Sequence, residues 1–552
     1  MAGRKNWREK RAAGINRAAP EVTAAAASVS PAAPGVNRAA SMRRALQSSR
    51  AVVRMFDAGE TDRLTASWGT TPLTADDVVR RNQRVLVARS REQAANNDHG
   101  KAFLRMVRQN VVGPRGVQLQ AQAQDIGGVL DRVANEAIEA AWAKWCRPQT
   151  ADVTGQMSWR SLQGLLTITA ARDGEFMVRV ITGAQAGPWG FSLQVIDPQR
   201  CPVDFDEGRR RDGSFVRHGI EFNEFGRPLA YYFSSTGARD AEYLFGGRSF
   251  VRVPADEILH GFLPEMIGQK RGIPWMATAL WRMRMLDGFE KAALVNARAS
   301  AAKMGFFEWD KDMAPAEDPN ADPADREPYS IDAEAGTYHE LPPGLSYKAA
   351  DPQYPAGELA VFGKAMLRGI ASGLGVAYNG LANDLEGVNF SSIRQGALDE
   401  REHWKDLQEW LTECLHQRVF DRWLRYSLLS GQIVTEQGAA LPARSLEKFA
   451  RISWQPRRWA WIDPRAEVDA AIKSKNSLLI PPGQIIRDQG RDPESTWKEY
   501  GRDIAAMRAA GMPDLFIMTS LGLEPAPADP AENPSQSEQP DPFEGDPDAP
   551  QP

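Results

Sequence analysis

The stretch RVPADEILHGFLPEMIGQKRGIPWMATALWRMRMLDGFEKAALVNARASAAKMGFFE, residues 252–308, decides how this chain folds. A turn and short strand over residues 254–260 leads to Pro274, and proline is well placed to open a helix. No other proline follows before residue 303, and apolar side chains recur along one side of this segment. The pattern predicts one long helix over residues 275–303.

Charged side chains follow one stripe of this predicted helix. Arg284, Lys291 and Arg298 recur every seven residues, and Asp287 lies three residues after Arg284 and four before Lys291. Charges at these spacings can form ion pairs on a helix. The simplest interpretation is a solvated helix face.

The chain before this stretch changes from helices to strands. Helices are predicted over residues 74–110, 128–145 and 159–171. Thr74 is a plausible N-cap of the first, and Val129, Val133, Ala137, Ala140 and Ala141 are expected to share one face of the second. Residues 175–250 contain short alternating runs separated by Gly, Pro and Asp, which predicts antiparallel strands and an α+β fold.

The chain after this stretch is mostly helical. Residues 310–329 hold four prolines and seven acids, so they are expected to form an exposed loop. A helix is predicted over residues 357–378, a polar loop at NDLEGVN (383–389) and a long Trp-containing helix over 390–429. Short helices are expected to begin near residues 465, 481, 492 and 513.

The segment RISWQPRRWAW, residues 451–461, alternates basic and aromatic side chains. Such a combination can stack on and neutralise a single nucleic-acid strand. The favoured interpretation is structural, because Trp459 and Trp461 alternate as the inward face of a strand does. The tryptophans of the long helix, Trp404, Trp410 and Trp423, are likewise expected to be packing anchors.

Composition excludes several classes of protein. The 552 residues are 42% hydrophobic and 25% charged, with no uncharged apolar run near the roughly 18 residues that span a membrane. Cys146, Cys201 and Cys414 form no C-x-x-C pair, so no disulfide framework or thiolate zinc cluster is expected. No membrane partner is expected.

Opposite charges are concentrated at the two ends of the chain. Residues 1–50 carry ten Lys and Arg against two Glu, whereas residues 521–552 carry eight Asp and Glu and no Lys or Arg. With a total of -4, the remainder is only mildly acidic, which argues against tight binding to duplex DNA over a large surface. Both ends are expected to be disordered, although a targeting peptide is an alternative for the first.

No catalytic, cofactor or metal site is indicated. The chain has no phosphate-binding G-x-x-x-x-G-K-[ST] loop, no H-E-x-x-H pair and no G-x-S-x-G elbow. The six histidines are scattered, and adjacent acids diverge on a helix or strand. We therefore expect a protein that is not an enzyme and needs no cofactor.

The opening stretch closely resembles the lambda-type portal proteins of tailed phages. The likeness covers about residues 40–520 and continues through REQAANNDHGKAFLRMVRQNVVGP (91–114), DGEFMVR (173–179), VIDPQRC (195–201), GIEFNEFGRPLAYYF (219–233), LANDLEGVNFSSIRQGALDEREHWKDLQEWL (381–411) and GRDPESTWKEYGRDIAAMRAAG (490–511).

The resemblance implies a ring, usually of twelve subunits, at one capsid vertex. Through it the terminase large subunit would pump double-stranded DNA, which binds weakly in transit, and head-tail adaptor proteins would attach. Capsid and scaffold proteins are further implied partners. The expected locations are the virion and, during assembly, the host bacterial cytoplasm.

The resemblance also implies a portal-type subdomain layout. It gives a basic disordered tail (1–40), a wing (41–270), a stem helix (271–304), a clip (305–355) with an acidic loop (310–329), a second stem helix (356–378), a tunnel loop (379–389), a long wing helix (390–429), a crown (430–520) and an acidic disordered tail (521–552).

The residues implied to lie nearest DNA are those of the tunnel loop. They are Asn383, Asp384, Leu385, Glu386, Gly387, Val388 and Asn389. Acidic side chains there would repel phosphate and prevent DNA from sticking. In such a ring, the Arg284, Lys291 and Arg298 stripe would form ion pairs between subunits or a basic belt in the channel.

Two alternatives remain open from the sequence. One is a scaffold protein without a channel that binds nucleic acid through its basic start and the 451–461 segment. The other is a capsid-associated hydrolase, such as a nuclease or protease, with diverged motifs.

Overall fold

The computed structural model describes residues 69–234, 249–301, 305–310, 340–349, 358–387, 389–459 and 464–520, together with Arg63 and Ser67. The chain divides into two compact units, Met1–Pro72 and Leu73–Pro552, and nearly all of the described residues belong to the second. Most of the acidic loop, both tails, Val388 and Trp461 lie outside the described residues, so the expectations for them remain predictions.

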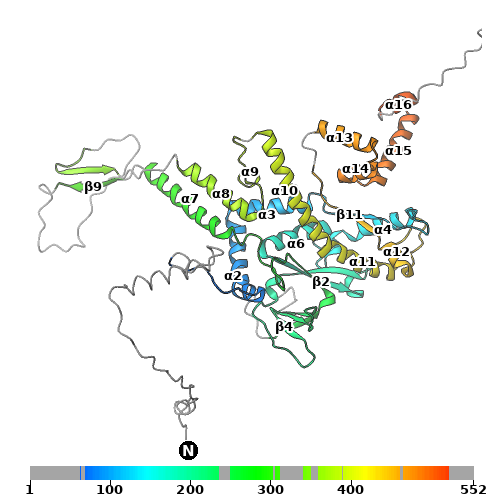
Figure 1. Ribbon diagram of the computed structural model, residues 1–552, viewed down its shortest axis with the longest axis horizontal. Coiled ribbons are helices and arrows are strands. Elements are labelled where there is room, and N and C mark those ends of the chain that lie inside the picture. The colour runs from blue at the N-terminus through cyan, green and yellow to red at the C-terminus, as the bar shows by residue number, and fades with distance from the viewer. Residues whose placement is uncertain are drawn as a thin grey trace, which may run out of the picture. The chain divides into compact units, whose positions relative to one another are not determined.

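Helices and short antiparallel sheets alternate in the second unit, which confirms a mixed helix and sheet fold (Figure 1). Its first half contains α2 (Ala75–Asn96), α3 (Asp98–Val107), a π-helical turn (Arg108–Val112), α4 (Arg132–Trp145), α5 (Pro148–Ala151) and α6 (Trp159–Asp173). Thr74 caps α2 through the backbone N–H of Asp77, as its side chain predicts.

Two predictions for these helices are wrong. The expected single helix over residues 74–110 is interrupted at Asn97, whose side chain instead caps α3 by accepting from the N–H groups of His99 and Gly100. The second helix begins at Arg132, four residues later than predicted. Val129 consequently precedes the helix, and both Val129 and Val133 are exposed.

Four antiparallel sheets are present in the described residues. Three strands pair in the order β3 (Phe191–Ile196), β2 (Glu175–Thr182), β8 (Ile258–Phe262), and four in the order β4 (Phe215–Arg217), β5 (Ile220–Phe222), β6 (Pro228–Phe233), β7 (Val251–Pro254). Two pairs complete the set: β1 (Gln118–Ala121) with β11 (Ile452–Gln455), and β9 (Gly305–Trp309) with β10 (Leu345–Ala349).

The second half of the chain is helical, as predicted. It contains α7 (Leu280–Ala301), α8 (Glu358–Leu374), α9 (Tyr378–Ala382), α10 (Phe390–Leu411), a π-helical turn (Thr412–His416), α11 (Gln417–Leu429), α12 (Leu446–Phe449), α13 (Pro464–Asn476), α14 (Pro482–Asp488), α15 (Pro493–Ala509) and α16 (Asp514–Ser520). α7 begins five residues after the predicted start, because residues 275–279 form turns. The predicted long helix over 390–429 is continuous but contains the π turn.

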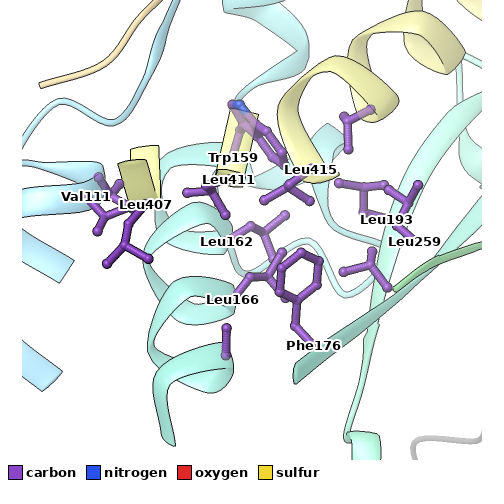
Figure 2. Close-up of a cluster of buried hydrophobic side chains, with 14 of the residues drawn as sticks. Val111, Trp159, Leu162, Leu166, Phe176, Leu193, Leu259, Leu407, Leu411 and Leu415 are labelled. Atoms are coloured by element: carbon purple, nitrogen blue, oxygen red, sulfur yellow. The ribbon is translucent and has the colours of Figure 1, made fainter. Parts of the chain in front are cut away.

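The main core lies between α6, the β2 sheet and the long helix formed by α10 and α11. Figure 2 shows Leu162 and Leu166 of α6 between Phe176 of β2 and Leu411 and Leu415 of the long helix. Trp404 and Trp423 are almost completely buried, which confirms their packing role. Trp423 also meets Trp142 edge-on, with ring centroids 4.8 Å apart.

The 451–461 segment folds differently from its prediction. β11 ends at Gln455, before the prolyl residue Pro456, so Trp459 is not on a strand. Its ring is partly buried, and its indole N–H donates to Asn110 Oδ1 at 3.1 Å. Trp459 is therefore a packing residue, as predicted, but it does not lie on a strand.

A buried ion pair joins the β2 sheet to the segment that enters α7. Arg271 and Glu175 are both completely buried, with Arg271 Nη2 2.6 Å from Glu175 Oε1. Arg271 Nη1 donates to the carbonyls of Cys201 and His218 at 3.0 and 2.8 Å. His260 Nε2 donates to Glu175 Oε2 at 3.0 Å, so each buried charge is surrounded by hydrogen-bond partners.

Candidate functional site

The candidate site is built on a pair of antiparallel helices, α7 and α8 (Figure 1). Just before α7, Thr278 Oγ1 donates to the carbonyl of Gly373 at the end of α8, at 2.8 Å. Eleven residues further along α7, the ring of Phe289 meets Phe362, eleven residues earlier in α8, with centroids 5.1 Å apart. The second contact lies eleven residues later than the first along α7 and eleven residues earlier along α8, so the two helices run antiparallel.

The structure places the basic stripe on the exposed side of α7. Arg284 contacts Glu92 of α2 at 3.3 Å and Asp287 at 3.8 Å. Among the residues that the structure describes, Lys291 and Arg298 are exposed and have no ion pair. One member of the stripe therefore ties α7 to α2 within the chain, and two remain available to other molecules.

The tunnel-loop residues form the turn between α9 and α10. Asn383 has a left-handed backbone (φ 52°), a conformation that asparagine tolerates better than most residues, and Gly387 (φ 69°) reverses the chain a second time. Asn389 then caps α10, because its side chain accepts from the N–H of Ser392 at 2.8 Å. The loop thus projects between two fixed helix ends.

Lys364 on α8 forms ion pairs with both acidic residues of the loop, Asp384 and Glu386. Its Nζ lies 3.2 Å from Asp384 Oδ2 and 3.1 Å from Glu386 Oε2. Tyr378 also donates to Asp384 at 2.7 Å, and the Arg368 guanidinium lies over the Tyr378 ring at 5.5 Å from its centroid. These contacts anchor the base of the loop to α8 and α9.

The hydrogen bonds fix the protonation states of this cluster. Those from Tyr378, from the Glu386 backbone and from Lys364 lower the pKa of Asp384 to about 2. The same carboxylates raise the pKa of Lys364, with the Glu386 hydrogen bond the largest cause. Asp384 is consequently ionised and Lys364 protonated at neutral pH.

The tip of the loop faces solvent. The Glu386 side chain is 82% exposed and Leu385 is 69% exposed. The loop itself, residues 383–389, carries two acids and no base, whereas Lys364 and Arg368 lie beside its base. Its negative charge is therefore most accessible at the exposed tip, on Glu386.

The chemistry available elsewhere in the described residues is limited. No group of three or more His, Cys, Asp or Glu side chains there could hold a metal ion, and no helix there is long and apolar enough to cross a membrane. Burial raises the pKa of Cys201 to about 11 and that of Cys414 to about 12, so both thiols stay protonated and unreactive.

Two residues of this cluster, Lys364 and Tyr378, were not predicted from the sequence. Lys364 lies twenty positions before Asp384, on a separate helix, and no local spacing connects them. Tyr378 is six positions from Asp384, and its hydroxyl reaches the carboxylate only because α9 ends in the left-handed Asn383. Neither contact has a short-range sequence signal.

Comparisons with known proteins agree on one family. Residues 61–408 match the model of the family described as phage portal protein, lambda family. The chain is 33% identical over 468 residues to a probable portal protein of Halomonas phage phiHAP-1, covering 84% of this chain and 89% of that protein. It is 23% identical over 428 residues to portal protein B of Escherichia phage lambda, covering 70% and 76%.

A solved structure is also similar in part. The neck of an empty gene transfer agent particle contains a chain that is 15% identical, with a TM-score of 0.38, over 78% of this chain and 98% of that chain.

Proposed function

Because the chain belongs to the lambda family of phage portal proteins, we propose that its copies form a ring around a DNA channel at the capsid vertex. A portal is a structural component of the virion, and this family assignment favours it over the scaffold and hydrolase alternatives. The observation that carries the proposal is the family match over residues 61–408, a range that includes α7, α8 and the loop 383–389, which we propose as the stem helices and the tunnel loop.

Exposed apolar side chains on the stem support self-association. Trp281, Met285 and Val295 of α7 are 69%, 44% and 63% exposed, and positions four and fourteen apart return to the same side of a helix. Val361 of α8 is 71% exposed. Large apolar groups left in water on neighbouring helices mark a surface that a partner covers, here a second copy of the chain.

The tunnel loop is the proposed contact with DNA in transit. Its net negative charge, repeated around a ring, would keep phosphate at a distance and so limit friction. Lys291 and Arg298 remain candidates for ion pairs between subunits or for a basic belt, while Arg284 already pairs within its own chain.

The clip is the proposed attachment surface. β9 and β10 form its described part, and the acidic loop 310–329 between them is proposed to enlarge the surface that meets terminase or the head-tail adaptors. Scaffold and capsid proteins would surround the wing, with assembly in the host cytoplasm. Energy for DNA movement would come from terminase.

The test is a charge reversal in the loop. Replacing Asp384→Lys and Glu386→Lys together should slow or stall packaging, because a ring of lysines attracts phosphate. The measurement is packaging velocity with purified terminase and proheads that carry the variant. A matched control, Asp399→Lys and Glu402→Lys on α10, changes the same charge outside the loop and should leave velocity unchanged. Wild-type velocity in the loop variant would contradict the proposal.

The ring itself is tested by electron microscopy with class averaging of the purified protein, supported by light-scattering mass. Rings with an opening wide enough for a duplex would establish the architecture and give the number of subunits. A monomer that does not assemble even with scaffold and capsid protein would overturn it.

A further inference from the structure

Four arginines surround one cavity where the wing meets the crown. The cavity, of about 240 Å³, is walled by residues 112–118, 455–458 and 489–491. It contains Arg115, Arg457, Arg458 and Arg491, and none of its lining residues is acidic. We name this feature the arginine hollow.

The positive charge of the hollow is largely uncompensated. Arg457 Nη1 donates to the carbonyl of Gln109 and to Asn110 Oδ1, at 2.6 and 2.5 Å, both uncharged groups. Within the part of the chain that the structure describes, Arg115, Arg458 and Arg491 have no ion pair, and the buried Arg458 Nε has no hydrogen-bond partner. Like charges gathered in a cavity are unfavourable unless an anion joins them.

The aromatic rings of the same segment are not available to stack on bases. Trp454 packs against Trp142 and Phe420, with centroids 6.2 and 6.1 Å away, and its indole N–H donates to Gln417. The guanidinium groups of Arg401 and Arg457 lie over the Trp459 ring, 5.9 and 5.7 Å from its centroid. The hollow therefore offers charge without a stacking surface, which favours an anionic group over a nucleobase.

We propose that the arginine hollow binds the acidic tail of this same polypeptide, residues 521–552. The tail carries eight Asp and Glu and no Lys or Arg, so its charge is opposite to that of the hollow. Arginine is well suited to carboxylates because its planar fork can donate two parallel hydrogen bonds. The tail would supply the counter-charge that the described residues lack.

The connection along the chain makes this pairing possible. Arg491 lies between α14 and α15, α15 contacts α16, and α16 ends at Ser520, where the tail begins. Thirty-two residues span at most about 100 Å when extended, so reach does not limit the contact. A tethered ligand is present at an effective concentration of roughly millimolar, so modest affinity gives substantial occupancy.

A carboxylate-rich peptide suits the hollow better than duplex DNA. The cavity is small and walled by three segments, and a single side chain on an extended chain can enter it. A duplex presents its phosphates on a wide, stiff rod, and its binding needs a basic surface over many phosphates.

The first experiment measures arginine reactivity in the full-length chain. In a neutral-tail variant, every Glu of residues 521–552 becomes Gln and every Asp becomes Asn. The arginines are modified with p-hydroxyphenylglyoxal, and the modification is followed by peptide mass spectrometry. Arg115 and Arg491 should react about tenfold faster in this variant than in the wild type. This factor is expected if the effective concentration of the tail is about ten times its dissociation constant. Arg89, exposed on α2, is the internal control and should not change.

The reciprocal experiment leaves the tail intact. Arg115→Gln with Arg491→Gln should release the tail, so that the glutamate-specific protease Glu-C cuts within residues 521–552 several-fold faster. A matched pair on α2, Arg84→Gln with Arg89→Gln, should leave that cleavage rate unchanged. Circular dichroism shows that each variant is folded before its rate is compared.

Three outcomes would overturn the proposal. Unchanged reactivity of Arg115 and Arg491 in the neutral-tail variant would mean that the tail does not cover them. An equal rise at Arg89 would mean a general loosening instead of release from the hollow. Protection of the wild-type arginines by added duplex DNA, with no effect of the neutral tail, would assign the hollow to phosphate.

Discussion

At the scale of single residues, the buried Arg271 and Glu175 pair has the clearest energetic consequence. Burial raises the pKa of Glu175, but the Arg271 charge and the His260 hydrogen bond outweigh it and lower that pKa to about 2. Both partners are therefore charged in the core, where a lone charge is far less stable than a paired one.

Glu175→Gln should destabilise the protein by roughly 3–5 kcal/mol, because it leaves the Arg271 guanidinium buried without its counter-charge. The measurement is the free energy of unfolding from urea titration at pH 7. The control is Glu257→Gln, which breaks the partly exposed 2.8 Å pair with Arg179 and should cost about 1 kcal/mol or less. Equal losses in the two variants would contradict this account.

The π-helical turn contains a second residue with a measurable consequence, His416. Burial lowers the pKa of His416 to about 4, although Nδ1 donates to the Leu411 carbonyl at 3.1 Å. In the unfolded chain the pKa is about 6.5, so the unfolded state binds the proton first as pH falls. The contribution of His416 to the free energy of unfolding is therefore complete above pH 6.5 and is lost as the pH falls towards 4.

His416→Gln should remove up to about 3 kcal/mol of the change in unfolding free energy between pH 7 and pH 4. Urea midpoints measured across that range in wild type and variant give the difference directly. A variant that keeps the full wild-type slope would exclude His416 as its source.

At the scale of elements, the entry to α7 depends on two glycines in contact. A Cβ on Gly272 would lie 2.1 Å from the carbonyl oxygen of Gly174, closer than any real contact. Gly174 itself has φ 91°, a left-handed conformation that ends α6. The end of α6 and the segment that enters α7 therefore approach each other backbone to backbone.

Gly272→Ala should lower the free energy of unfolding by about 2 kcal/mol or more, because backbone must move to admit the methyl group. Gly288→Ala is the matched control: it lies inside α7 with open space at its Cβ, and should stabilise the helix by up to about 1 kcal/mol. In the two urea titrations, the free energy of unfolding should therefore fall for Gly272→Ala and rise for Gly288→Ala. A loss of similar size in both would show that glycine flexibility, not close approach, matters here.

Elements with local signals were predicted well, and long-range contacts were not. Thr74 marked a helix start, and local signals near residues 465, 481, 492 and 513 marked the starts of α13 to α16, because caps and prolines act within a few residues. The interruption at Asn97 was missed although the polar run NNDHG (96–100) contains a local signal, an N-cap asparagine followed by Asp98 in the first turn of α3. The contact between Lys364 and Asp384 joins separate helices, so only the fold reveals it.

At the scale of the whole molecule, the exposed apolar stripe on α7 is the surface through which we propose that copies of the chain assemble. Trp281→Gln, Met285→Gln and Val295→Gln together should prevent ring formation while leaving the fold intact, because these side chains are already in water in the single chain. Light-scattering mass and electron microscopy give the readout, and circular dichroism checks folding.

The control triple variant removes apolar groups that are even more exposed, from turns outside α7: Ile126→Gln, Phe225→Gln and Leu478→Gln. It should assemble as the wild type does. Rings from the α7 variant, or loss of rings from the loop variant, would exclude the stem as the assembly surface.

The antiparallel pairing of α7 and α8 also has an evolutionary consequence. The chain leaves the helical pair along α7 and returns to it along α8, so the described strands β9 and β10 belong to a segment that begins and ends at one pair of helices. Segments of that kind tolerate exchange and changes in length, since neither end has to move. If this segment is the attachment surface proposed above, it could be exchanged or lengthened to match a new partner while the rest of the subunit is inherited unaltered.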